Sequence, residues 1–530
     1  MNSENIFDAI TDIREEIITE AKEHRFSKPR RIVTRWSTIA ASLVLIIGIG
    51  GYLLISTGRL SAPGGSPGGA ASGAGGAGRQ EGSTVFMSYA GPVFPLSLQG
   101  DSAGISAERD ISLDFNGFGT RRSADSGLLL YHNDIRVVDS YTLTNDAEDD
   151  KTVSIIYPFE GTFADLQRLQ PTITIDGNEL ETGLVAGAYS GGFMGTGPKD
   201  AHLAINLRQV SSWEEYVALL SDGEYLKRAV GEQAALDQTV AVYEFSNSWA
   251  NHDAAVNPTL AASFCLDYDR TTILSYGFHG ASRDRESGFM RQSFSVPGEG
   301  FPGSGRSFYL IVVGDDITEL NIQGYINGGC DAGDEMDEVG ADVTRYEAIL
   351  SDVIAFLLED FLTVTEDYSA GDPQSISDSI YFAMLYRAAV EHLCEYGVLS
   401  ENTAFRYDTG WLEEIFSETR LIKRVFYLTA DIQIPAFGSA RLKAEMIKPG
   451  SYDYYGAHLG NIGVYGYDMV ITLGSGFVFD SLTASIAGSE WIEIVRQNFG
   501  FDPENDILVV TLDLDMPHYY IEVRGAAPGG

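Results

Sequence analysis

The segment DIRVVDSYTLTNDAEDDKTVSIIYPFEG, residues 134–161, contains two runs in which apolar and polar side chains alternate. The apolar positions are Ile135, Val137, Tyr141 and Leu143 in the first run, and Val153, Ile155, Tyr157 and Phe159 in the second. A period of two places such side chains on one face of a β-strand. The acidic stretch NDAEDDK between the runs is typical of an exposed turn. The pattern therefore predicts a β-hairpin with one buried face.

A second pair of alternating runs occurs near the end of the chain. Its apolar positions are Phe426, Leu428, Ala430, Ile432 and Ile434, then Ala440, Leu442, Ala444 and Met446. The stretch PAFGS between them has the composition of a turn. We expect a second hairpin of similar design here, although no fixed-period repeat relates the two.

The remaining sequence indicates an α+β protein that is mainly β. Many short strand-like runs separated by Gly-rich turns predict antiparallel β-sandwich-like domains. A helical period appears at Tyr346, Ile349, Leu350, Val353, Leu357 and Phe361. Ser212 and Glu215 form a capping box that predicts one further helix, and Gly397 is placed to end another. We expect a β-rich ectodomain at residues 83–341, a helical segment at 342–422, a β-rich domain at 423–525 and a tail at 526–530.

Charge and cysteine content limit the classes of function. The chain has 530 residues and a formal net charge of −40. Residues 1–35 hold seven acidic and seven basic side chains, so the whole excess lies after Arg35. So acidic a body repels phosphate backbones, which excludes nucleic acid as an expected partner. Cys265, Cys330 and Cys394 form no C-x-x-C motif; we expect free thiols, with one disulfide as the alternative.

The N-terminal region predicts a single-pass membrane protein. Residues 39–55 carry no charge, and extension to residues 36–56 gives the length of a transmembrane helix. Lys28, Arg30, Arg31 and Arg35 precede this span, so the N-terminus is expected in the cytoplasm and the large C-terminal part outside it. A cleaved signal peptide is the alternative. Residues 57–82 are rich in Gly, Ser, Ala and Pro and are expected to form a flexible linker.

Two stretches are candidate ligand sites. Asp331, Asp334 and Asp337 are closely spaced oxygen donors of the kind that calcium prefers, but they lack the EF-hand spacing, and a solvated acidic loop is the preferred interpretation. The stretch SYDYYGAHLGNIGVYGYD contains five tyrosines: Tyr452, Tyr454, Tyr455, Tyr465 and Tyr467. Aromatic rings on a loop can stack on sugars or anchor a protein interface, but they can also pack a domain core.

No decisive catalytic signature is present. Ser102 lies in a G-x-S-x-G match, but neither a strand-turn-helix context nor a suitable histidine accompanies it. Two D-x-D pairs, Asp267 with Asp269 and Asp513 with Asp515, would share a face if they lay on strands. The histidines show no paired metal spacing. We therefore expect no cofactor and no metal centre, and keep an exported hydrolase as a remote alternative.

Residues 5–26 form an amphipathic helix with a narrow apolar stripe. Ile6, Ile10, Ile13 and Ile17 follow a heptad-like spacing, with Ser3 as a candidate N-cap. So thin a stripe is not stable alone and needs another surface, which can be a second copy, the membrane or a cytoplasmic protein. A helix that only leads into the span is the plain alternative.

The helix NIFDAITDIREEIITEAKEHRF, its basic flank and the following span resemble the start of anti-sigma-factor-like single-pass proteins of Gram-positive anaerobes. This resemblance implies that the helix binds a sigma factor and that the ectodomain senses the envelope. The stretches FMSYAGPVFPL, SYTLTND, YPFEG and NIQGYINGGCD resemble an uncharacterised exported family, which implies no activity. We expect a regulatory or sensing protein, with a surface module that recognises envelope glycan or protein as the alternative.

Overall fold

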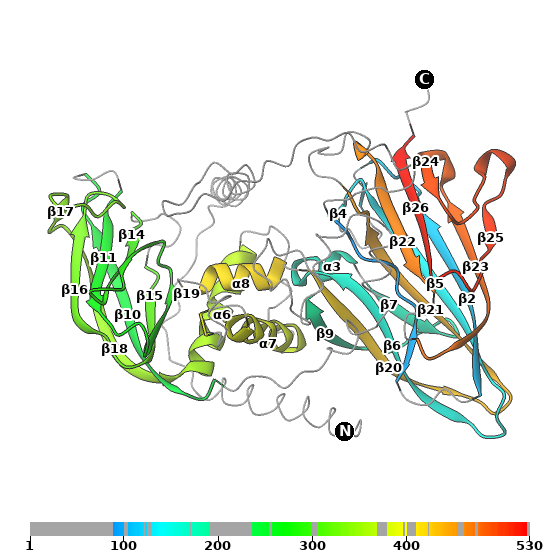
Figure 1. Cartoon of the computed structure of the whole chain (residues 1–530), viewed down its shortest axis with the longest axis horizontal. Helices are drawn as coiled ribbons and strands as arrows, with labels where there is room; N and C mark the ends of the chain where they lie inside the picture. Colours follow the sequence, from blue (N-terminus) through cyan, green and yellow to red (C-terminus); the bar gives the residue numbers. More distant parts are fainter. Residues whose placement is uncertain are drawn as a thin grey trace. The chain divides into compact units, whose positions relative to one another are not determined.

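The structure is a computed structural model, and it forms two compact units (Figure 1). It describes residues 88–99, 104–120, 122–123, 129–169, 171–189, 236–253, 257–298, 305–367, 379–395, 398–399, 410–421, 423–452, 461–471 and 475–526. Unit 1 contains the described residues between 234 and 417, and unit 2 those within 80–233 and 418–530. Both units are mainly β, as the sequence predicted.

The two units replace the linear division into residues 83–341 and 423–525. Strands from both of these ranges share sheets in unit 2, so the chain leaves unit 2, forms unit 1 and returns. The reason is that strands pair over long distances in the sequence, and local composition does not show which strands pair.

Unit 2 contains a seven-stranded sheet and a four-stranded sheet. The first has the order β25-β23-β2-β5-β21-β7-β8 and the second β1-β6-β20-β9. The seven strands are Val509–Thr511, Val478–Ala487, Ile105–Asp114, Asp134–Asn145, Ser439–Pro449, Thr172–Ile175 and Asn178–Glu179. The four strands are Ser97–Gln99, Lys151–Gly161, Arg424–Ile434 and Gly183–Tyr189. Their neighbours are antiparallel except for β2 and β23, which are parallel.

Smaller elements complete unit 2. A three-stranded sheet has the order β22-β26-β24, with strands Tyr465–Val470, His518–Gly525 and Ile492–Gln497. A two-stranded sheet pairs β3 (Arg122–Ser123) with β4 (Leu129–Leu130). The short helix α3 (Leu166–Leu169) follows η1 (Phe163–Asp165), and two more 3-10 turns, η4 (Ser489–Trp491) and η5 (Pro503–Asn505), lie near the C-terminal strands.

Both predicted hairpins are wrong in their pairing, although all four strands exist. β5 pairs with β21 and β6 pairs with β20, so each expected hairpin is a connection between two sheets. In register, Tyr141 lies opposite Leu442, and Tyr157 opposite Leu428. A period of two identifies the buried face of a strand, but strands that face each other across a core show the same period as strands that pair. The alternation alone could not distinguish these two arrangements.

A buried ion pair lies at the centre of unit 2. Arg109 on β2 and Asp139 on β5 form two hydrogen bonds of 2.9 Å, and both side chains are fully buried. The Arg109 guanidinium also donates to the Val470 carbonyl (2.9 Å). Tyr141 and Tyr157 donate to Asp139 over 2.7 and 3.3 Å, and burial raises the pKa of both phenols, so they remain donors. The pair therefore links β2, β5, β6 and β22.

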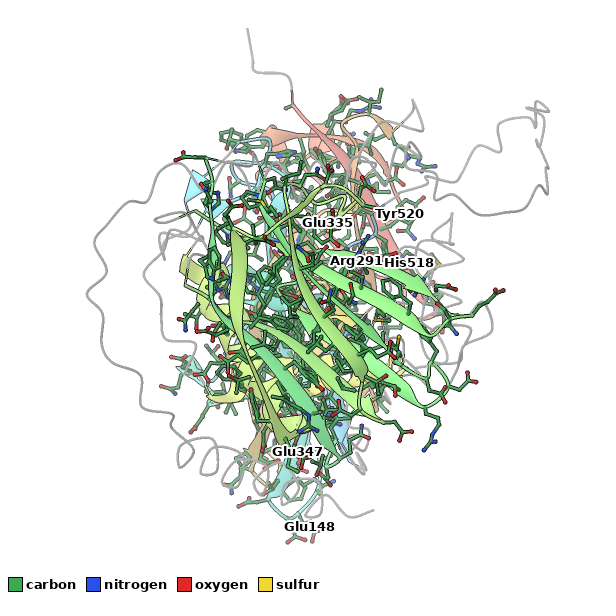
Figure 2. All side chains as sticks on the ribbon, turned by 90° about the vertical axis from the view of Figure 1, so that its left-hand side faces the viewer. Glu148, Arg291, Glu335, Glu347, His518 and Tyr520 are labelled. Atoms are coloured by element: carbon green, nitrogen blue, oxygen red, sulfur yellow. The ribbon has the colours of Figure 1, made fainter. Side chains whose placement is uncertain are left out.

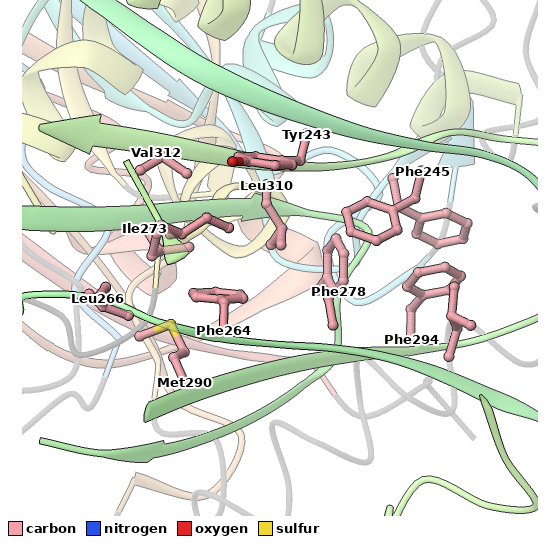
Figure 3. Close-up of a cluster of buried hydrophobic side chains, with 14 of the residues drawn as sticks. Tyr243, Phe245, Phe264, Leu266, Ile273, Phe278, Met290, Phe294, Leu310 and Val312 are labelled. Carbon is pink, nitrogen blue, oxygen red and sulfur yellow. The ribbon is translucent and has the colours of Figure 1, made fainter. Parts of the chain in front are cut away.

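Unit 1 is a sandwich of two five-stranded sheets covered by helices. One sheet has the order β18-β10-β15-β12-β19, with strands Val339–Ile349, Thr239–Ala250, Phe308–Gly314, Thr271–Tyr276 and Gly410–Trp411. The other has the order β13-β14-β11-β16-β17, with strands Gly280–Asp284, Phe289–Ser295, Thr259–Cys265, Thr318–Tyr325 and Glu335–Met336. Aromatic rings fill the space between the sheets (Figure 3). Phe294 and Phe308 stack with centroids 3.8 Å apart, and Phe278 meets Phe294 edge-on.

The helical segment is confirmed but begins later than expected. Its described helices are α6 (Leu350–Asp367), α7 (Ser379–Glu395) and α8 (Leu412–Leu421). Residues 342–349, expected to be helical, belong to β18 and pair with β10. Tyr346 and Ile349 fit the helical period by coincidence, because both are exposed on an edge strand. α6 buries Leu350, Ile354 and Leu358 completely.

Several predictions fall on residues that the structure does not describe. These include the N-terminal helix, the span at residues 36–56, the linker at 57–82, the tail beyond Ala526, Ser212 and Gly397. Within the described ranges, no helix has both the length and the apolar character needed to cross a membrane.

Loss of the Asp139 charge should destabilise unit 2. We expect Asp139→Asn to cost about 3–5 kcal/mol, because it leaves the Arg109 charge buried without its counter-ion. Urea titration of the full-length chain, read by limited proteolysis and mass spectrometry of unit 2 peptides, measures the change. The control is Asp110→Asn on the exposed face of the same sheet, expected to stay within about 0.5 kcal/mol of the native chain. Equal midpoints for the two variants would contradict the assigned role.

Candidate functional site

The candidate site begins with the turn that precedes β5. The Tyr131 N–H donates to Oδ2 of Asp134 (2.8 Å), and the Asp134 N–H donates back to the Tyr131 carbonyl (3.1 Å). Arg168, just before the end of α3, donates to both Asp134 oxygens over 2.7 and 2.6 Å. Its guanidinium lies over the Tyr131 ring, 4.7 Å from the centroid. A buried carboxylate and an overlying cation therefore hold this turn in one shape.

Tyr467 supports the turn from below. Its hydroxyl donates to the Asn133 carbonyl (2.6 Å), and its ring packs edge-on against Phe115 and Phe118. Only 2% of Tyr467 is exposed, so this member of the predicted tyrosine site is a core residue. Gly450 also belongs to the support, because its N–H donates to Asn133 and a side chain there would collide with the Tyr467 hydroxyl.

Two of the predicted tyrosines, Tyr452 and Tyr465, are half-buried and lie beside the turn. The Tyr465 hydroxyl is hydrogen-bonded to Nε2 of His132 (2.6 Å), and the ring of Tyr452 lies 6.3 Å from that of Tyr465. Tyr131 is 46% exposed, and His132 is exposed as well. We call Tyr131, His132, Tyr452 and Tyr465 the tyrosine surface. Tyr454 and Tyr455 lie outside the described residues.

The sequence pointed to half of this surface. Tyr452 and Tyr465 stood out through the density of tyrosines around them, whereas Tyr131 and His132 lie more than 300 positions earlier in the chain. The pairing of β5 with β21 and the hydrogen bond between Tyr467 and Asn133 bring the two segments together. Tyr131 and His132 were not predicted. In the sequence they are only two residues before a strand, a position that indicates a turn and no binding role.

Charged groups lie buried near the support. Lys448 on β21 donates to the Ala90 carbonyl (2.6 Å), and burial lowers the pKa of its ammonium to about 8 against the opposing effect of nearby Glu160 and Asp468. Asp468 accepts from the Tyr89 hydroxyl (2.7 Å) and contacts Nε2 of His518 (2.8 Å). These side chains join the segment around residue 90 to β21, β22 and β26. Because they are buried, we assign them a positioning role.

The chemistry of the tyrosine surface suits binding. Aromatic faces stack on sugar rings or apolar side chains, and the His132 ring and the Tyr465 hydroxyl supply directional hydrogen bonds. Burial raises the pKa of the Tyr465 phenol, which therefore stays protonated near neutral pH. The only carboxylate that we find in its turn, Asp134, is completely buried and bonded to Arg168.

The acidic loop proposed for calcium is a network of turns. Oδ2 of Asp334 accepts from the Asn327 amide (3.0 Å), and Oε2 of Glu335 accepts from the Gly333 N–H (2.7 Å). Figure 2 shows Glu335 and Arg291 at the same end of unit 1, where Arg291 donates to the Cys330 carbonyl. In the part of the chain that the structure describes, no three His, Cys, Asp or Glu side chains are grouped to hold a metal ion. Asp331 and Asp337 thus lie in a loop without a described metal site.

The two D-x-D pairs lie in turns instead of on strands. Oδ1 of Asp267 accepts from the N–H of Asp269 (2.9 Å), and Oδ1 of Asp513 accepts from the N–H of Asp515 (3.0 Å). In each pair the first carboxylate closes an Asx turn, which explains the spacing without catalysis. Ser102 lies outside the described residues. Cys265, Cys330 and Cys394 are not joined in disulfides, as expected.

A second polar cluster, in unit 1, joins helices to the sandwich. The Tyr276 hydroxyl and the Arg306 guanidinium both donate to Oδ2 of Asp360 on α6, over 2.9 and 2.6 Å. Glu413, in the first turn of α8, accepts from the Gly277 N–H that follows β12. Burial raises the pKa of the Glu413 carboxyl to about 7. Each group binds a neighbouring element, so the cluster holds α6 and α8 against the sheet.

Glu413 should make the stability of unit 1 depend on pH. Its pKa is about 7 when folded, against an ordinary value of 4.5, so the native state binds the proton more tightly. The stabilisation is complete below pH 4.5 and is lost as the pH rises to about 7. We expect Glu413→Gln to match the native chain at pH 4.5 and to exceed it by about 1–3 kcal/mol at pH 8.

Urea titrations of the full-length chain at both pH values, read on unit 1 peptides, measure this difference. Glu286→Gln, at an exposed turn of the same unit, is the control and should change neither value. An equal pH dependence for the native chain and Glu413→Gln would show that Glu413 does not titrate in this range.

No protein-family model matches the chain, and no curated protein matches it at the significance required. Its function is therefore inferred from its own residues.

Proposed function

We propose that the chain is a single-pass membrane protein of the regulatory or sensing type, with units 1 and 2 outside the cytoplasm. The observation that carries the proposal is the order of segments: an amphipathic helix and a basic flank that together balance in charge, an uncharged run at residues 39–55 and a flexible linker. The charge of −40 falls entirely on the part placed outside. Such a body is repelled by anionic lipid headgroups, so the linker holds it away from the membrane surface.

The cytoplasmic end of the proposal is the apolar stripe of Ile6, Ile10, Ile13 and Ile17. It supports binding of a cytoplasmic protein, and the resemblance to anti-sigma-factor-like proteins favours a sigma factor. The linker at residues 57–82 spans roughly 30 Å as a random coil and transmits orientation poorly. The signal that reaches the cytoplasmic helix is therefore the presence or release of the ectodomain. A rotation of the ectodomain transmitted through the membrane is disfavoured.

Charge placed in the stripe should abolish partner binding. We expect the full-length chain, tagged and extracted in mild detergent, to retain a specific protein from cytoplasmic extract, identified by mass spectrometry. Ile10→Asp/Ile13→Asp should reduce recovery by at least about tenfold, because carboxylates would be buried in an apolar contact. Thr19→Asp, on the opposite helical face, is the matched control and should leave recovery unchanged. Recovery of no specific partner, or equal recovery by all three chains, would rule out this role.

A second candidate function is recognition of an envelope glycan or protein, and the tyrosine surface favours it. The specific observation is the network of buried contacts that supports the exposed Tyr131 ring and its neighbours. Arg168 and Asp134 hold the turn that carries Tyr131 and His132. A preorganised aromatic surface loses little entropy when it binds, so each ring can contribute fully to affinity. This function is compatible with sensing, because the bound molecule would be the signal.

Loss of a ring from the tyrosine surface should weaken ligand binding. We expect the full-length chain to bind fragments of cell-wall glycan on an array, and Tyr131→Ala and Tyr465→Ala each to lower affinity by about tenfold. Tyr325→Ala in unit 1 removes a half-exposed tyrosine elsewhere and is the control. Binding that is absent, or equal in all these chains, would eliminate glycan recognition by this surface. Isolation of an envelope protein by the native chain but not by Tyr131→Ala would identify the protein alternative.

A further inference from the structure

β18 is the longest edge strand among the described residues of either unit. It runs from Val339 to Ile349 and pairs along one side with β10. No described strand pairs with its other side. Such an edge presents N–H and C=O groups that can continue the sheet.

The exposed side chains of β18 are suited to pairing. Val343, Tyr346 and Ile349 are 36%, 37% and 36% exposed, and β-branched and aromatic residues favour strand contacts. Arg345 and Glu347 lie on one face of the strand, 3.6 Å apart. Figure 2 shows Glu347 toward the end of unit 1 opposite Glu335. By contrast, β13 at the edge of the other sheet has only five residues, and its exposed side chains include the charged Arg283 and Asp284.

The order of residues around Tyr346 is chemically symmetric. In an antiparallel pair of two β18 strands centred on Tyr346, each residue faces the one that lies equally far on the other side of the centre. The opposed pairs are Val343 with Ile349, Thr344 with Ala348, Arg345 with Glu347, and Tyr346 with its own copy. Apolar residues therefore meet apolar residues, and each positive charge meets a negative one. Cross-strand pairs of these kinds are the favourable ones.

We propose that β18 pairs antiparallel with β18 of a second copy of this chain, in the register centred on Tyr346. The sheet that contains β18 in one copy would then continue into the same sheet of the second copy across a two-fold axis. The symmetry of the strand identifies the occupant, since a two-fold contact requires one surface to be complementary to itself. The charges also set the register, because a shift by two residues would bring Arg345 opposite its own copy or Glu347 opposite its own copy.

Charge reversal tests whether Arg345 and Glu347 of the two copies face each other. Arg345→Glu and Glu347→Arg each place like charges opposite one another twice, so each variant should weaken self-association by at least about tenfold. A mixture of the two variants should form a heterodimer, in which every opposed pair is again complementary. The double variant Arg345→Glu/Glu347→Arg should self-associate like the native chain. Arg345 also pairs with Asp316 of its own chain (2.8 Å), whereas Glu347→Arg leaves that contact intact.

The measurement is sedimentation velocity of the full-length chain in detergent, with the detergent mass subtracted. Arg283→Glu on β13 is the matched control and should remain dimeric. A native chain that is monomeric at all concentrations used overturns the proposal. Single variants that dimerise as well as the native chain, or a mixture that stays monomeric, overturn it too.

Cross-linking tests the register without charge changes. Tyr346→Cys places the two thiols opposite each other, and mild oxidation should give a covalent dimer beyond the background of the native chain. Ala348→Cys is the control, because residue 348 faces residue 344, and the two new thiols lie about 13 Å apart. Equal cross-linking of both variants, or of neither, would reject the register centred on Tyr346.

Discussion

The ion pair between Arg109 and Asp139 is the constraint on which unit 2 depends. A buried pair is tolerated only when the remaining donors and acceptors are satisfied. Here Arg109 donates to the carbonyls of Phe94 and Val470, while Tyr141 and Tyr157 donate to Asp139. These partners come from both sheets and from both halves of unit 2. The cluster is therefore complete only when Val470, from the last part of the chain, has joined the residues that precede unit 1.

This constraint explains why unit 1 can be inserted into unit 2. The strands β5 and β6 precede unit 1, and their partners β21 and β20 follow it. Unit 1 has its own core of aromatic rings between two sheets, so it does not need the core of unit 2. Unit 2, in contrast, has no complete central sheet until the chain returns at residue 423. We expect the insertion to make unit 2 the later of the two to fold, because its contacts are more distant in sequence.

The tyrosine surface and the β18 edge are held in place by different contacts. The tyrosine surface has a rigid support, since Asp134, Arg168 and Tyr467 use their polar groups to hold the turn below it. Such a surface suits a ligand that does not reshape it. The β18 edge is prepared in another way: its backbone is ordered by β10, and its outer side is left unpaired by the described strands. Its specificity lies in the order of its side chains.

Local patterns in the sequence were sufficient for the mainly β character, for most strands and for three helices after residue 342. They were sufficient because alternation and helical periods reflect which side of an element is buried, whatever that element packs against. Pairing was decided by the tertiary structure, and so β5 and β6 lie in different sheets. The tertiary structure also moved Tyr467 into the core, placed Tyr131 and His132 beside Tyr465, and put Asp267 and Asp513 in turns. Each of these outcomes depends on contacts between residues far apart in the chain or on the exact end of a strand, which a local period does not contain.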